Sequence, residues 1–197
     1  MARLTGVPED HAGPFMKVLY RLMRRGMRKL AGRSPDRGLE PLEMFAVLPG
    51  LLRGYGRMEQ ATAKLHGTDR RTHALATLKA ATMTQCEYCI DLGSAIARRW
   101  GLTDEELLAL PRHRTSDLFS DADKLVLDYA EGMSRTPVEV PDELFAALRR
   151  HFDEAQLVEL THLIALENLR GRFNLALGIG AAGFSEGLVC AVPAAAG

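Results

Sequence analysis

Two of the chain's three cysteines stand three residues apart, at Cys86 and Cys89. The stretch before them, 72–83, is rich in alanine and lacks Gly and Pro, and a second helical stretch, 90–100, ends at Gly101. This pattern predicts a helix, a short break, and a new helix that begins at or near the cysteine pair. The first turn of a helix stabilises a thiolate, because its backbone N–H groups lack intrahelical partners and the helix dipole is positive there.

The cysteine pair is therefore a candidate redox centre. In such a setting the pKa of a cysteine falls from about 8.5 to roughly 3.5–7.5. One sulfur can attack a substrate and the other can resolve the intermediate as a disulfide, so Cys86 and Cys89 are the candidate catalytic residues. Helix position alone favours Cys86 as the more activated thiol.

Two plainer roles compete with redox chemistry. Buried cysteines can pack as small apolar residues. A structural zinc site needs two further ligands, but the third cysteine, Cys190, lies in a Gly/Ala-rich tail and no second Cys-x-x-Cys or His-x-x-x-His follows. We therefore expect neither a metal nor another cofactor.

The bulk composition describes an ordinary globular protein. A chain of 197 residues fits one domain with a sizeable core, and its formal net charge of zero gives no sign of nucleic-acid binding. No signal-peptide pattern opens the sequence, and three cysteines are too few for a secreted disulfide scaffold. A reducing cytoplasm is the expected compartment, where a Cys-x-x-Cys is more often catalytic than structural.

The segments of the chain that must position the cysteine pair are predicted to be helices. No segment shows period-2 alternation with β-branched residues, so we predict an all-α fold of about eight helices. Helix starts are marked by Thr103 with Glu106, by Ser120 with Asp123 and by Asp153 with Gln156. We divide the chain into an N-terminal extension (1–39), a helical domain (40–184) and a mobile tail of small residues (185–197).

The N-terminal extension carries a basic amphipathic helix that starts at Pro14. An apolar stripe runs through Met16, Tyr20, Met23, Met27 and Leu30, and six Lys and Arg residues lie outside this stripe with no acid among them. Such a helix can lie on an anionic membrane or grip a partner. The stripe lacks a Trp or Phe belt, so packing on its own domain or on a second subunit is favoured over membrane contact.

The last long helix is apolar apart from a few polar residues. At 100° per residue Thr161, Asn168 and Arg172 share one face, whereas Glu167 and Asn174 share another. Polar residues on a core helix usually pair with each other or with backbone groups. The functional alternative is that Asn168 or Arg172 helps to form the cysteine pocket or a subunit interface.

Taken together, these residues resemble the carboxymuconolactone decarboxylase / AhpD-like alkylhydroperoxidase family. The resemblance covers roughly residues 40–184 and rests on four segments, which are the helix 70–83 with Cys86-Glu87-Tyr88-Cys89, then 135–141, 153–160 and 167–178. It implies an all-α protein that forms dimers, trimers or hexamers. It also implies a thiol-dependent peroxidase that reduces hydroperoxides, is re-reduced by a dithiol partner, and uses Cys89 as the attacking sulfur and Cys86 as the resolving one.

The chain departs from the peroxidase-type motif of that family. The motif has a Glu twelve residues before the first cysteine and a His four after the second, but these positions hold Ala74 and Gly93 here. The usual proton relay is therefore missing. Residues that could serve instead as acid–base or pocket groups are Glu87, Asp91, His73, Tyr88, Asn168 and Arg172.

Three functions follow from these observations. The first is a dithiol peroxidase of the peroxiredoxin type. The second is a decarboxylase-type lyase, for which Arg172 could hold a substrate carboxylate. The third is a non-catalytic redox sensor or binding protein, which the absent relay favours.

Overall fold

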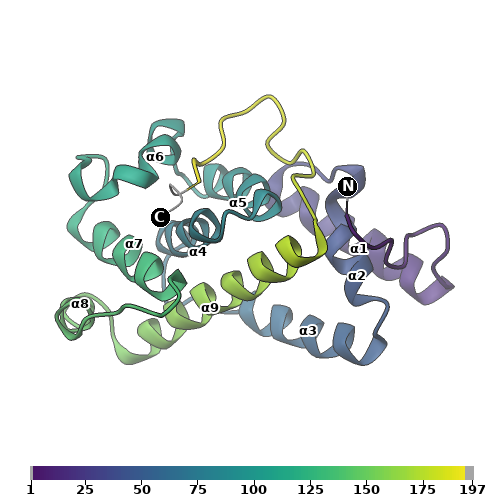
Figure 1. The fold of residues 1–197 in the computed structure, drawn as a ribbon, viewed down its shortest axis with the longest axis horizontal. Coiled ribbons are helices and arrows are strands. Elements are labelled where there is room, and N and C mark those ends of the chain that lie inside the picture. The colour runs from purple at the N-terminus through teal and green to yellow at the C-terminus, as the bar shows by residue number, and fades with distance from the viewer. Residues whose placement is uncertain (1, 194–197) are drawn as a thin grey trace.

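The computed structural model describes residues 2–193, and all regular secondary structure within this range is helical (Figure 1). This confirms the predicted all-α class. None of the helices in the described range is both long and apolar enough to cross a bilayer. The elements, with two 3₁₀ helices labelled η, are α1 (Pro14–Ala31), η1 (Asp36–Leu39), α2 (Glu40–Phe45), α3 (Pro49–Thr62), α4 (Arg70–Thr84), α5 (Glu87–Arg99), α6 (Asp104–Ala109), η2 (Leu110–Thr115), α7 (Asp121–Ser134), α8 (Asp142–Leu148) and α9 (Glu154–Leu177).

Helix α4 forms the centre of the domain, and α5, α7 and α9 pack around it (Figure 1). Its alanines let the neighbouring helices approach closely, and Leu75 and Leu78 fill the space between them. Removing these side chains from water is the main stabilising contribution of the central helices.

The predicted helix starts are confirmed in detail. Thr103, Ser120 and Asp153 each accept a hydrogen bond from the backbone N–H three residues later, and the side chain at that later position bonds back to the cap. Each capping box satisfies two backbone donors that the helix itself leaves unpaired.

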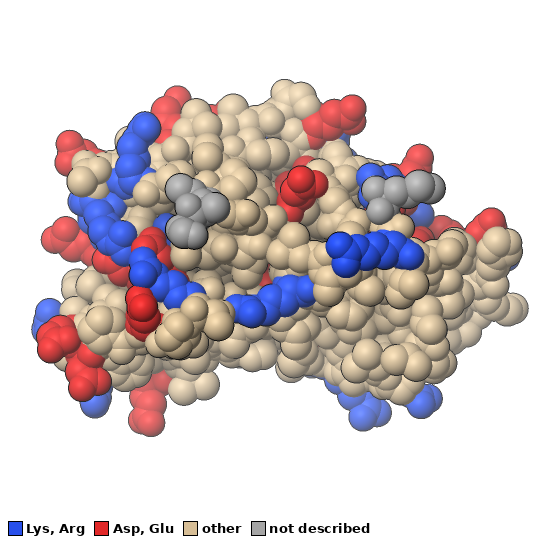
Figure 2. Space-filling view, viewed as in Figure 1, with Lys and Arg blue, Asp and Glu red and all other residues tan. Residues whose placement is uncertain are grey.

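A buried ion pair joins α4 to α7. Lys79 Nζ lies 2.8 Å from Glu131 Oε2, and both side chains are almost fully buried. Arg114 and Arg135 each donate to Glu131 at 3.0 Å from the outer side. Burial alone would raise the pKa of Glu131, but the bonds from Lys79, Arg114 and Arg135 lower it to about 2. Around α7 and α8 the surface carries interspersed charges of both signs (Figure 2).

Helix α1 turns only part of its predicted apolar stripe toward the domain. Tyr20 is fully buried, and its hydroxyl donates to the carbonyl of Val7 at 2.6 Å. Met23 and Leu30, which belong to the same predicted stripe, are exposed. The core-facing side of α1 is therefore narrower than its apolar side.

The segment after α9 packs against α5 within the described range, and it spans residue 184, the predicted boundary between the helical domain and the tail. Asp91 on α5 accepts the backbone N–H groups of residues 182–185, at 2.7–3.0 Å. Phe184 is buried, and Ala191 N–H donates to Ser94 Oγ at 3.0 Å. The carboxylate of Asp91 thus anchors the backbone of residues 182–185 to α5. Residues 194–197 of the predicted tail lie outside the described range.

Candidate redox site

The break between α4 and α5 sets the position of the cysteines, as the sequence predicts. Gln85 ends α4 in the left-handed conformation with φ of 56°, and Cys86 is the N-cap of α5. Cys86 Sγ accepts a hydrogen bond from the backbone N–H of Cys89 at 3.2 Å. The sulfur of Cys86 therefore occupies the place that a Ser or Asp oxygen fills in an ordinary N-cap.

Cys86 and Cys89 form a disulfide, with their Cα atoms 5.2 Å apart. The pair is buried: Cys86 is 0% exposed and Cys89 is 6% exposed. In the reduced state, the unpaired N–H groups and the dipole at the start of α5 would stabilise a thiolate at this point. Cys89 is the more exposed of the two residues.

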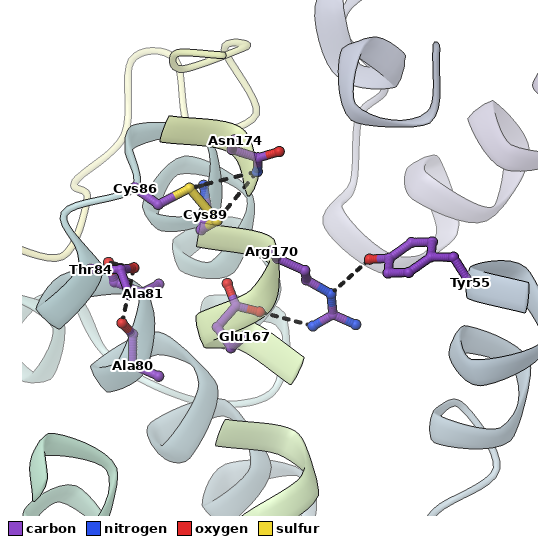
Figure 3. The surroundings of a disulfide bond; sticks show 9 residues. All are labelled: Tyr55, Ala80, Ala81, Thr84, Cys86, Cys89, Glu167, Arg170 and Asn174. Atoms are coloured by element: carbon purple, nitrogen blue, oxygen red, sulfur yellow. Dashed lines mark hydrogen bonds and ion pairs between the residues drawn. A yellow bond between two sulfur atoms is a disulfide. The ribbon is translucent and has the colours of Figure 1, made fainter. Parts of the chain in front are cut away.

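Asn174 on α9 is the polar side chain that reaches the disulfide (Figure 3). Its Nδ2 donates to Cys86 Sγ at 3.6 Å and to Cys89 Sγ at 3.5 Å, and the residue is buried. An amide N–H directed at both sulfurs favours the ionised form of whichever thiol loses its proton. Asn174 is thus the site residue that the sequence analysis missed.

The two α9 residues that the sequence analysis proposed for the pocket lie elsewhere. Asn168 donates to Ser134 Oγ and to the carbonyl of Ile164, both at 2.9 Å. Arg172 is exposed and donates to Thr136 Oγ1 at 2.8 Å. The helical geometry behind the prediction was right, but the face toward the cysteines is the one that carries Glu167 and Asn174.

A glycine on this same face lets α9 come close to the end of α4. A Cβ atom placed on Gly171 would lie 2.5 Å from Thr84 Oγ1, too close for any real contact. Gly171 is three residues before Asn174. The close approach of α9 to α4 at Gly171 therefore helps to set the position of the Asn174 amide relative to the cysteines.

A charged network lies on α9 one to two turns before Asn174 (Figure 3). Arg170 donates to Glu167 at 2.8 Å, to both carboxylate oxygens of Glu59 and to the hydroxyl of Tyr55 at 3.2 Å. Burial raises the pKa of Glu167, and the nearby Arg170 opposes this rise. The network ties α3 to the helix that carries Asn174.

The remaining predicted acid–base residues do not meet at the sulfurs. Asp91 is held by the backbone amides of the C-terminal segment. Tyr88 is buried, which raises the pKa of its phenol, and its hydroxyl donates to the carbonyl of Gly38 at 2.6 Å. Both side chains hold the structure around α5 together.

His73 and Glu87 also point away from a shared site. His73 lies about three turns before the end of α4. Its ring packs edge-on against Trp100, with the ring centroids 5.2 Å apart. Burial lowers the pKa of His73. Glu87 is exposed in the first turn of α5. Within residues 2–193 no group of three or more His, Cys, Asp or Glu side chains could hold a metal ion.

The comparisons with known proteins agree with this architecture. A model of the carboxymuconolactone decarboxylase family matches residues 49–132, the part of the chain that contains the cysteine pair. The uncharacterized protein YdfG of Bacillus subtilis (strain 168) is 33% identical over 122 residues, which are 61% of this chain and 82% of that protein. This chain belongs to the carboxymuconolactone decarboxylase family.

A second family relative is the uncharacterized protein YnjA of Escherichia coli (strain K12). It is 44% identical over 126 residues, and the match spans 64% of this chain and 66% of the length of YnjA. Comparison with solved structures shows that the fold is AhpD-like.

Two crystal structures share the fold over nearly the whole chain. A variant of the debrominase Bmp8, in complex with 2,3,4-tribromopyrrole, has a TM-score of 0.73 at 22% identity and covers 92% of this chain and 95% of its own. The alkylhydroperoxidase AhpD core of a peroxidase-related protein from Ralstonia eutropha JMP134 has a TM-score of 0.70 at 22% identity, with 91% and 92% covered. At this identity the likeness establishes the AhpD-like fold, and a Cys-x-x-Cys disulfide within it fits a redox function.

Proposed function

We propose that this family member is a dithiol–disulfide oxidoreductase that reduces small hydroperoxides through Cys86 and Cys89. The observation that carries the proposal is the placement of both sulfurs at the N-terminus of α5, beneath the side-chain amide of Asn174. Two neutral N–H donors and the helix dipole act on the pair in a buried setting, where they stabilise negative charge more strongly than in water.

The proposed cycle begins at Cys89, which is the more exposed residue of the pair. Its thiolate attacks the terminal oxygen of the hydroperoxide, an S–O bond forms, the O–O bond breaks, and the alkoxide leaves and takes up a proton. The sulfenic acid on Cys89 is then attacked by Cys86, which releases water and closes the disulfide. An external dithiol supplies the two electrons that restore the reduced pair.

The same arrangement explains how the chain could work without the usual relay. Ala74 is buried, and a Cβ atom on Gly93 would lie 3.1 Å from Leu78 Cδ1, so both relay positions face packed apolar surroundings. A thiolate held by N–H donors needs no neighbouring carboxylate, which would raise its pKa. Asn174 cannot carry a proton, so in this proposal the proton reaches the alkoxide from solvent.

A non-catalytic redox sensor is the second candidate, because the two sulfurs are almost completely buried. A lyase is less well supported. Arg172, the proposed carboxylate anchor, is exposed and bonded to Thr136, away from the cysteine pair.

Turnover of an alkyl hydroperoxide by the reduced chain, with a dithiol present in excess, tests the proposal. Cys86→Ser and Cys89→Ser should each abolish turnover, and Cys89→Ser should also prevent formation of a sulfenic acid. Cys190→Ser is the matched control, because Cys190 is free and outside the pair, and it should keep full activity. Equal consumption of peroxide by all three variants would reject the proposal, and a disulfide that forms without turnover would favour the sensor.

A further inference from the structure

Helix α1 presents an apolar face that the domain does not cover. Phe15 is 79% exposed, Val18 is 52% exposed and Leu22 is 51% exposed. Their spacing of three and four residues places them on one side of the helix. The buried side, which contains Tyr20, faces the opposite direction, because Tyr20 lies about 160° around the helix from Leu22.

Basic residues lie on and beside this face. Helix α1 contains six Lys and Arg residues and no acid. Arg24 is engaged with Glu9 and with the carbonyls of Pro35 and Asp36. Among residues 2–193, no ion pair or hydrogen bond engages the side chains of the other five, which are Lys17, Arg21, Arg25, Arg28 and Lys29. This differs from the region around α7 and α8, where charges of both signs are mixed (Figure 2).

We propose that α1 binds the surface of an anionic phospholipid bilayer, lying in the interface with Phe15, Val18 and Leu22 inserted. A helix that exposes Phe, Val and Leu on the same side as Lys and Arg, and that is too polar to span a bilayer, has the composition of an interfacial helix. The edge position of α1 in the molecule leaves it accessible (Figure 1). From the sequence, packing on the domain or on a second subunit was favoured over membrane contact. That preference rested on the stripe around Tyr20 and did not consider Phe15.

Charge complementarity selects a lipid surface over a second copy of the chain. In a symmetric contact, the α1 helices of two copies would lie against each other, and their unpaired Arg21, Arg25 and Lys29 side chains would be brought together. Like charges at an interface oppose association. Anionic headgroups instead meet every one of these side chains with the opposite charge.

Co-sedimentation of the full chain with vesicles tests the proposal. Binding is expected to vesicles that contain phosphatidylglycerol, to be much weaker with phosphatidylcholine alone, and to fall as salt is raised. Val18→Glu/Leu22→Glu and, separately, Arg25→Glu/Lys29→Glu should each weaken binding by about tenfold or more. The matched controls Val158→Glu, exposed on α9, and Arg149→Glu/Arg150→Glu, exposed after α8, should bind like the wild type.

A probe at the inserted position gives a second readout. Phe15→Trp should show a blue-shifted emission with phosphatidylglycerol vesicles and no shift with phosphatidylcholine vesicles. Absence of binding, or equal binding by Val18→Glu/Leu22→Glu, would overturn the proposal. The proposal would also be overturned if the wild type did not bind vesicles but formed a dimer, measured by size-exclusion chromatography with light scattering, that Val18→Glu/Leu22→Glu abolished. In that case α1 would form a contact between two copies of the chain.

Discussion

The side-chain Nδ2 of Asn174 lies 3.5 Å from the Sγ of Cys89, although 85 residues separate them in the chain. The same amide reaches Cys86. One helix therefore supplies the sulfurs and another supplies the donor that stabilises their charge, so the properties of the pair depend on how α9 packs against α4 and α5.

Changing Asn174 should alter the acidity of the reactive thiol. Asn174→Asp places a carboxylate beside the sulfur and should raise the thiol pKa by about one unit or more, whereas Asn174→Leu removes the donor and should raise it less. The pH dependence of iodoacetamide alkylation, measured on the reduced chain in a Cys190→Ser background, reports this pKa. Asn168→Asp is the control, because Asn168 bonds to Ser134 and Ile164 instead. A pKa that is the same in all variants would mean that Asn174 does not act on the sulfurs.

Gly171→Ala should push α9 away from α4, because the new Cβ would lie 2.5 Å from Thr84 Oγ1. We expect a loss of about 1–3 kcal/mol in the free energy of unfolding, with partial recovery when Thr84→Ala is added. Chemical denaturation measures both. Gly54→Ala is the matched control: Gly54 has open space around its Cβ position in α3, so alanine should be neutral or stabilising there. Equal effects of Gly171→Ala and Gly54→Ala would show that a methyl group fits at Gly171 without displacing α9.

Asp91→Ala should release the segment 182–185 from α5. The carboxylate accepts four backbone N–H groups, so its loss should reduce the free energy of unfolding by at least about 3 kcal/mol and remove the protection of these amides from hydrogen exchange. Asp121→Ala, in the exposed first turn of α7, serves for comparison. Unchanged protection of residues 182–185 would contradict a structural role for Asp91.

Glu131 should give the fold a specific dependence on acid. Its folded pKa of about 2 lies below its ordinary value of 4.5, so its contribution to stability is complete above about pH 4.5 and is lost as the pH falls toward 2. Glu131→Gln should cost about 3–5 kcal/mol at neutral pH, because Lys79 remains buried without its partner.

The difference between wild type and Glu131→Gln should shrink as urea denaturation is repeated at lower pH. Glu139→Gln, which removes an exposed partner of Arg135, should cost less than about 1 kcal/mol at any pH. A gap between wild type and Glu131→Gln that stays constant from pH 7 to 2 would contradict the lowered pKa.

The local signals in the sequence predicted the parts of the site that depend on local structure. Alanine-rich α4, the break at Gln85 and the start of α5 at the cysteines follow from helix propensity and capping. The capping boxes at Thr103 and Asp153 were also predictable, because the residues that form them are three apart.

The parts that depend on packing could not be predicted in this way. The period of α9 sorted its polar residues into two faces, but only the tertiary structure shows that the Asn174 face meets the cysteines. The presence of Gly171 on that face was a usable signal, since a glycine inside a helix often marks a close approach. The contact of the C-terminal segment with α5 has no local signal either, because Asp91 and the backbone groups that it binds at 182–185 are 91 to 94 residues apart in the chain.

The central claim is that the Cys86–Cys89 pair takes the two electrons of peroxide reduction, and the stoichiometry of a single turnover tests it most directly. Reduced Cys190→Ser chain is mixed with less than one equivalent of an alkyl hydroperoxide, and the alcohol formed and the thiols lost are counted by mass spectrometry. The proposed cycle requires that two thiols are lost, one Cys86–Cys89 disulfide is formed and one alcohol is produced for each hydroperoxide consumed. Thiols that stay reduced while the hydroperoxide remains intact would contradict it.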